Sequence, residues 1–167
     1  MDPLAHASIA LMARPAAPKA PLWALIAATQ VPDALFFAFQ AAGFERMAKT
    51  RLDLERGLVY ETQPRLPWSH GLLMNVVWAG VVAGLAQLVS RNRRTSAVMG
   101  LLAFSHWLLD ATVYNNLPLV FDDTPATGLG LITSRTGFVL GCGLEAVLIA
   151  GGIWAAVNQT VKKEVVP

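Results

Sequence analysis

The chain has 167 residues, of which 54% are hydrophobic and only 14% charged, and its net charge is +2. Soluble domains are about 45–50% apolar and about 25% charged, so this composition excludes an ordinary soluble domain. A charge this small, with no basic patch interleaved with aromatic residues, gives no support to nucleic-acid binding. Cys142 is the only cysteine, which excludes an intrachain disulfide and a thiolate metal cluster.

The N-terminal region is apolar but short. Residues 3–13 could not span a bilayer, because a spanning helix needs about 20 residues. We therefore expect a short helix that lies at the membrane interface or dips into a helix bundle. Three prolines, Pro15, Pro18 and Pro21, then predict a stiff connector.

Four later segments are long and apolar enough to cross a hydrocarbon core about 30 Å thick. They are approximately residues 22–42, 71–90, 97–117 and 137–157. The first is interrupted by Pro32-Asp33. The sequence therefore predicts one all-α domain over residues 1–167, a polytopic membrane bundle of four transmembrane helices plus the short N-terminal helix, with the lipid bilayer as its surroundings.

Two of these segments contain glycines four residues apart, Gly80 with Gly84 and Gly137 with Gly141. Such spacing is typical of membrane helices that pack closely against a neighbour. The same glycines are equally compatible with an apolar helix that merely tolerates them.

Two longer segments, residues 43–69 and 118–136, connect the predicted spans on one side of the membrane. The first is charged and contains two prolines, so we expect a solvated, loosely packed, extracytoplasmic loop. The short segments on the other side concentrate positive charge, which predicts that both termini are cytoplasmic. Their basic residues are Arg14, Lys19, Arg91, Arg93, Arg94, Lys162 and Lys163.

Four ionisable residues, Asp33, His106, Asp110 and Glu145, fall inside the predicted spans. Charged groups are costly in a bilayer, so each is a candidate functional residue. His106 and Asp110 are four residues apart and share one helix face. His70 stands at the outer entrance of the second span. Histidines and carboxylates gathered in this way suit either a zinc-like divalent ion or a proton relay.

Each of these residues also has a purely structural interpretation. His106 and Asp110 could neutralise each other, and Asp33 could satisfy backbone groups freed by the preceding proline. Glu145 could pair with Arg135 or with another helix. His70 could belong to a helix start in which Ser69 is the N-cap.

The order of these motifs resembles a bacterial inner-membrane family of metal-dependent hydrolases. The matching residues, which span most of positions 4–117, are His6, Pro32-Asp33, Trp68-Ser69-His70-Gly71-Leu72-Leu73 and Ser105-His106-Trp107-Leu108-Leu109-Asp110. The chain is also similar to a group of uncharacterised bacterial membrane proteins, through Leu117-Pro118-Leu119 and Gly128-Leu129-Gly130-Leu131.

This resemblance implies a metal site formed by His6, Asp33, His70, His106 and Asp110. The chain departs from the family pattern at Leu35, where a second acid would stand, and it lacks a His-Arg shortly before the Ser-His of the second span. The predicted topology puts His6 on the cytoplasmic side, away from His70, so we leave His6 out of the expected ligands.

We therefore expect an inner-membrane, metal-dependent hydrolase in which His70, His106 and Asp110 hold a divalent ion, zinc or similar. Asp33 would be a further ligand or the general base. The alternative is a non-catalytic membrane subunit or assembly partner, whose buried acids and histidines only hold helices together. A proton-coupled transporter has less support, because the sequence shows no repeat.

Overall fold

The computed structural model describes residues 1–53, 56–62, 64–121 and 125–165. Its described part contains six α-helices: α1 (Pro3–Ala13), α2 (Leu22–Thr29), α3 (Val31–Ala41), α4 (Leu72–Ser90), α5 (Arg93–Val113) and α6 (Arg135–Val165). Two short antiparallel strand pairs join them, β1 (Thr50–Asp53) with β2 (Gly57–Tyr60) and β3 (Leu117–Pro118) with β4 (Ala126–Thr127). Two 3-10 turns, η1 (Arg14–Ala16) and η2 (Leu131–Thr133), complete the elements.

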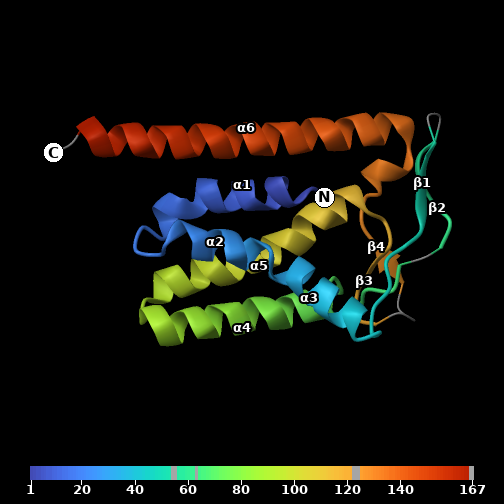
Figure 1. The fold of residues 1–167 in the computed structure, drawn as a ribbon, viewed down its shortest axis with the longest axis horizontal. Helices are drawn as coiled ribbons and strands as arrows, with labels where there is room; N and C mark the ends of the chain where they lie inside the picture. Colours follow the sequence, from blue (N-terminus) through green and yellow to red (C-terminus); the bar gives the residue numbers. More distant parts are fainter. Residues whose placement is uncertain (54–55, 63, 122–124, 166–167) are drawn as a thin grey trace.

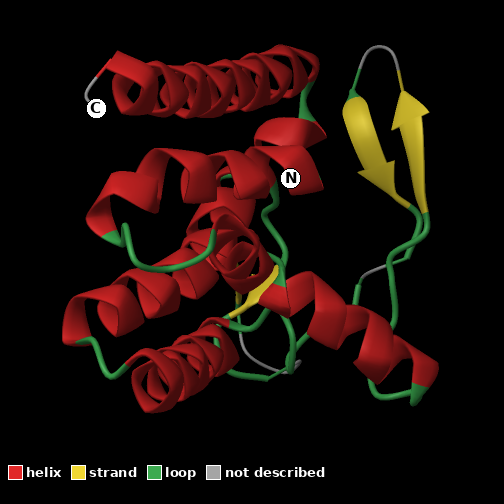
Figure 2. Ribbon diagram, turned by 60° about the vertical axis from the view of Figure 1, so that its left-hand side comes forward, coloured by secondary structure: helices red, strands yellow, loops and turns green. Residues whose placement is uncertain are grey.

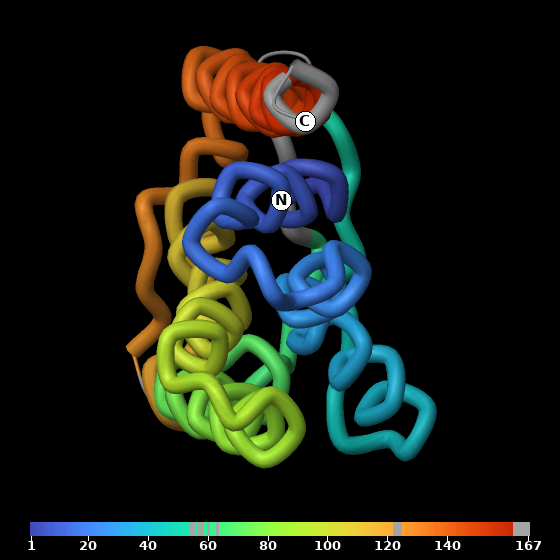
Figure 3. The backbone as a smooth tube through the Cα atoms, turned by 90° about the vertical axis from the view of Figure 1, so that its left-hand side faces the viewer, coloured from blue at the N-terminus to red at the C-terminus, as the bar shows by residue number. Residues whose placement is uncertain are grey.

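The helices run roughly along one axis, and the strands gather at one end of the bundle (Figure 1). Figure 3, which looks along the helices, shows α6 at one edge, then α1, then α2 and α5, with α4 at the opposite edge. Helix α5 contributes more buried side chains than any other described helix, among them Leu102, Ala103 and His106. Helix α5 is therefore the central helix of the bundle, with α1 and α2 on one side and α4 on the other.

Within the described residues, α4, α5 and α6 are long and apolar enough to cross a membrane. Helices α2 and α3 pass the same test only together, and they are bent by 53° where they meet. The bundle thus has three candidate spans, or four if the bent pair is one span. This confirms the predicted all-α, multi-pass character, whereas the count of four stays a prediction.

The predicted boundaries of the third span were displaced by about one turn. Helix α5 begins at Arg93 and ends at Val113, not at 97 and 117. The cause is local, because the Asn92 side chain accepts a hydrogen bond from the Thr95 N–H and so caps the helix start. The two arginines after the cap belong to the first turn of the helix rather than to the loop.

Helix α1 forms over the predicted residues 3–13. Its start is fixed by the Asp2 side chain, which accepts from the Leu4 N–H at 2.8 Å, and by a proline in the first turn. One face is buried, and Ser8 on that face lies so close to Gly152 of α6 that an added Cβ at Gly152 would be 2.7 Å from the Ser8 Cβ. The helix therefore lies inside the bundle.

The glycine that permits close packing of α4 and α5 is Gly100, which no predicted motif contained. A Cβ at Gly100 would lie 2.9 Å from both the Ala79 carbonyl oxygen and the Ala83 Cβ. At Gly80 and Gly84, by contrast, an added Cβ meets nothing within 4 Å. Close packing through Gly80 and Gly84 was therefore the wrong interpretation for this chain, and those two glycines are simply tolerated.

We expect Gly100→Ala to destabilise the protein by about 1–3 kcal/mol, because the new methyl group must push α4 away from α5. Gly84→Ala is the matched control, and it should be neutral or slightly stabilising because alanine favours helix. Thermal unfolding in detergent, followed by circular dichroism, measures both. Equal melting temperatures for the two variants would contradict the close approach at Gly100.

The segment between α3 and α4 has more structure than the predicted loop. Strands β1 and β2 pair with Thr50 opposite Tyr60 and Asp53 opposite Gly57, and the hairpin stands beside the helices (Figure 2). Residues 54, 55 and 63 lie outside the described part. The expectation of loose packing fails at Glu45, whose exposed fraction is 1%. Which side of the membrane this segment faces stays a prediction.

Candidate metal centre

Asp33, His70, His106 and Asp110 converge on one point in the bundle. Asp33 comes from the first turn of α3, His70 from just before α4, and the other two from α5. The Nε2 atom of His106 lies 3.5 Å from Asp33 Oδ1 and 3.4 Å from Asp110 Oδ2. The Nε2 atom of His70 lies 3.5 Å and 3.6 Å from the same two oxygens. The structure thus brings together all four predicted ligands.

The four side chains differ in their access to solvent. The exposed fraction is 1% for His106, 4% for Asp110 and 9% for His70, but 29% for Asp33. Asp33 is therefore the member of the cluster that an approaching molecule meets first.

The His106 ring is oriented by the backbone at the break between α2 and α3. Its Nδ1 lies 2.7 Å from the carbonyl oxygen of Thr29. A carbonyl oxygen only accepts, so Nδ1 carries the proton and donates it. In the neutral imidazole, Nε2 then presents a lone pair toward Asp33 and Asp110. Thr29 is the last residue of α2, and its carbonyl is available because helix ends leave carbonyls without helical partners.

The His70 ring is oriented by a second chain of hydrogen bonds. The Ser69 hydroxyl donates to Glu45 Oε2 at 2.6 Å, because a carboxylate only accepts. The hydroxyl oxygen then accepts from His70 Nδ1 at 2.7 Å. The Nε2 atom of His70 is directed at the two aspartates.

Glu45 is the residue of this site that the sequence did not reveal. Its other oxygen accepts the backbone N–H groups of Trp68 and Ser69, each at 2.8 Å, so the carboxylate fixes the turn before α4. Nothing in the local sequence separates Glu45 from the other charged residues of a loop. The alternative role of Ser69 as an N-cap is wrong, because Gly71 occupies the cap position of α4.

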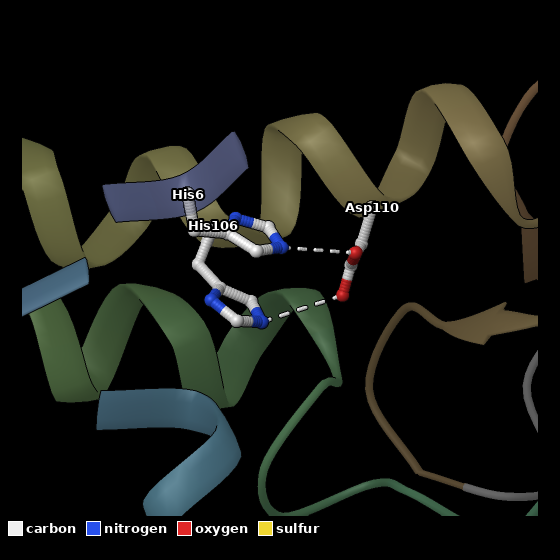
Figure 4. Close-up of side chains that lie close together, drawn as sticks. All are labelled: His6, His106 and Asp110. Carbon is white, nitrogen blue, oxygen red and sulfur yellow. Dashed lines mark ion pairs between the residues drawn. The ribbon is translucent and has the colours of Figure 1, made fainter. Parts of the chain in front are cut away.

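His6 also reaches the cluster, contrary to our expectation. Its ring stacks on His106 with the centroids 3.8 Å apart, and its Nε2 lies 3.4 Å from Asp110 Oδ1 (Figure 4). The expectation failed because α1 runs inside the bundle and starts beside Asp110. His6 therefore does not lie at the cytoplasmic side, where Arg14 was expected. Burial lowers the pKa of His6, against the opposing influence of Asp110.

Three further contacts hold the start of α1 at this place. The backbone amine of Met1 lies 2.7 Å from Asp110 Oδ1 and 3.0 Å from the Tyr114 hydroxyl. The Asp2 N–H donates to Glu145 on α6 at 3.1 Å. Glu145, one of the predicted intramembrane acids, therefore joins α6 to α1 and lies outside the cluster.

A cavity of about 240 Å³ opens from the cluster toward the hairpin segment. Asp33, His70 and Asp110 line it on the side of the cluster, and Thr50, Tyr114 and Asn116 are further polar residues of its lining. The remaining wall is mostly apolar and includes Phe36, Met47, Pro64, Leu66 and Leu117. A small amphiphilic molecule could enter there and reach Asp33.

Two groups of three side chains at this site could hold a divalent cation. A nitrogen lone pair opposite a carboxylate oxygen is repulsive unless a proton or a cation lies between them. Direct charge-assisted N–H···O bonds are about 2.7–2.9 Å long, shorter than all four distances here. The ligand atoms of Asp33, His70 and His106 lie within 4.8 Å of one another, and so do those of His6, His106 and Asp110. Each group is compact enough for one divalent ion, and His106 belongs to both.

A scan against protein-family models finds no match, and searches of curated proteins and of solved structures find no significant match. The fold is that of an all-α chain with apolar helices that fit a multi-pass membrane protein. Within it lie buried histidines and aspartates at metal-binding distance from one another, in two groups that share His106.

Proposed function

We propose that this chain is a metal-dependent hydrolase of the bacterial inner membrane, with its ion held by His70, His106 and Asp110 and with Asp33 as a further ligand or the general base. The observation that carries the proposal is the set of four nitrogen–oxygen distances between 3.4 and 3.6 Å, with both imidazoles held so that their Nε2 atoms face the carboxylates. The resemblance of the motif order to a family of inner-membrane hydrolases supports the same reading.

The residues of the cluster divide into two roles. His70, His106 and Asp110 are buried, and hydrogen bonds to neighbouring groups fix their orientation. They are therefore suited to hold the ion in place. Asp33 is both more exposed and part of the cavity wall, so it accepts the proton of the attacking water and returns it to the leaving group. A divalent ion supplies Lewis-acid chemistry at such a site. The apolar wall of the cavity favours a substrate with a lipid-like portion, beside either a phosphoester or another hydrolysable bond.

The test is the metal content of the wild-type protein, purified without chelators. We expect about one equivalent of zinc or a similar divalent ion, and a melting temperature that falls on chelation and recovers when the ion is restored. Gly84→Ala is a convenient control, because it lies on α4 away from the site. Protein that is free of metal, with a melting temperature indifferent to added zinc, manganese or iron, would rule out the proposal.

A second candidate function is that of a non-catalytic membrane subunit. It is favoured by the position of the cluster, which joins α1, α3, α5 and the start of α4 and would hold them together without any chemistry. The two functions differ in their response to Asp33→Asn. If the chain is an enzyme, this substitution should abolish hydrolysis while the helices stay assembled. If the chain is a structural subunit, neither the wild-type protein nor the variant should hydrolyse a substrate.

A further inference from the structure

A second, separate cavity of about 590 Å³ lies between α2 and α4, at the end of the bundle away from the hairpin. Helix α2 lines it with Trp23, Ala24 and Ala27, and α4 lines it with residues from Val82 to Ser90. Met99 of α5 also contributes to the lining. The cavity shares no lining residue with the cavity at the metal centre.

Small side chains on α2 create this groove. Ala24, Ala27 and Ala28 stand opposite Leu85 and Val89, so the two helices leave space between them. Leu85 and Val89 are 59% and 88% exposed, which places the groove on the outer surface of the bundle. In a bilayer this surface faces hydrocarbon, and an unfilled groove would forfeit the dispersion contacts that a lipid chain provides.

The length of the groove matches one leaflet of a membrane. Its α4 wall extends from Val82 to Ser90, which is about 12 Å at 1.5 Å per residue. Half of a hydrocarbon core about 30 Å thick is about 15 Å. The groove therefore has the length for an acyl chain from one leaflet and does not cross the membrane.

The two ends of the groove differ in chemistry. The deep end, at Val31 and Val82, is apolar, whereas Lys19 and Ser90 line the other end. Trp23, beside Lys19, is 72% exposed, as is typical of an aromatic side chain at the membrane interface. The groove is thus oriented, with its cationic end at the membrane surface.

The charge around that end has one sign. Residues 14–24 and 85–99 contain no Asp or Glu. They contain Arg14 and Lys19 before α2, Arg91 between α4 and α5, and Arg93 and Arg94 in the first turn of α5. Lys19 and these last three arginines are exposed. Basic residues next to a membrane surface attract anionic headgroups.

We infer that this groove is a binding site for an anionic phospholipid, with an acyl chain between α2 and α4 and the phosphate at Lys19. The lipid comes from the leaflet on the side of the Arg91–Arg94 turn. Because the floor of the groove includes Ala28, next to the Thr29 carbonyl that orients His106, the lipid also supports the end of α2. The site requires no metal and no hydrolase activity.

Native mass spectrometry of the full chain, released from detergent with equal amounts of phosphatidylglycerol and phosphatidylcholine of identical acyl chains, tests the inference. We expect phosphatidylglycerol to be retained in preference. Lys19→Gln should reduce that preference about fivefold, since one basic residue near the surface contributes about that factor. Ala27→Leu, which fills the groove, should reduce the binding of both lipids.

Lys49→Gln is the matched control, because Lys49 is exposed on the hairpin segment at the other end of the bundle. Equal retention of the two lipids by the wild-type protein would overturn the inference, as would equal effects of Lys19→Gln and Lys49→Gln. A dimer that Ala27→Leu dissociates, with lipid retention unchanged, would assign the groove to a second copy of this chain instead. None of these outcomes depends on the metal content.

Discussion

Replacing both His106 and Asp110 with leucine should give a folded protein that no longer retains a divalent ion. Two of the four ligands are lost, so we expect the bound metal to fall from about one equivalent to background. The thermal stabilisation by added metal should disappear with it, an effect of about 2.7 kcal/mol when the ion is present at 100 times its dissociation constant. Metal analysis and a melting curve with and without zinc measure both.

The double substitution separates a metal site from a simple ion pair, which the single variants do not. His106→Ala alone is harmful in either case, because it leaves a buried carboxylate without its partner. When both members of a buried pair become apolar groups of similar volume, the effect on folding is often close to neutral. A metal site adds the loss of the ion. Ser105→Ala is the control on the same helix, since its hydroxyl donates to the Leu102 carbonyl within that helix.

Glu45→Gln should weaken metal binding by about 10–100-fold, although Glu45 touches no expected ligand atom of the ion. The carboxylate accepts three hydrogen bonds, from the N–H groups of Trp68 and Ser69 and from the Ser69 hydroxyl. A glutamine amide would place an N–H₂ group against one of these donors. The Ser69 hydroxyl would then turn, and His70 would lose the acceptor that fixes its Nδ1 proton.

We also expect Glu45→Gln to destabilise the fold by about 1.5–3 kcal/mol, the usual value for a hydrogen bond to a charged group. Glu61→Gln is the matched control, because Glu61 lies on the same segment with 54% of its side chain exposed. A titration with zinc, read out by competition with a chromogenic chelator, measures the affinity. If the variant is less stable but binds zinc as tightly as the wild type, Glu45 supports only the fold.

Much of the architecture could be predicted because it depends on local composition. Long apolar segments must form helices in a membrane, and those helices appear within a few residues of their expected positions. The i,i+4 spacing of His106 and Asp110 placed them on one face, and in the structure their side chains lie 3.4 Å apart. Asp33 was a candidate because it lies inside a predicted span, and His70 because it lies at the entrance of the next one.

The features that escaped prediction depend on contacts between distant segments. His6 lies at the cluster because α1 runs inside the bundle, and the length of α1 did not decide between the interface and the interior. Glu45 acts on His70 through Ser69, across 24 residues of chain. Gly100, rather than the paired glycines, marks the close approach of α4 and α5, because a spacing pattern does not say which face of a helix meets a neighbour.

The break between α2 and α3 gives the backbone a chemical role. In an unbroken helix the Thr29 carbonyl would accept the N–H of Asp33, and neither group would serve the site. Because the chain turns at Gln30, the Thr29 carbonyl instead accepts a hydrogen bond from His106 Nδ1. Asp33 then lies in the first turn of a new helix, where the helix dipole favours a carboxylate. The site therefore could not be transplanted by grafting its side chains onto straight helices. A designer who wished to reproduce it would have to copy the kink before copying any ligand.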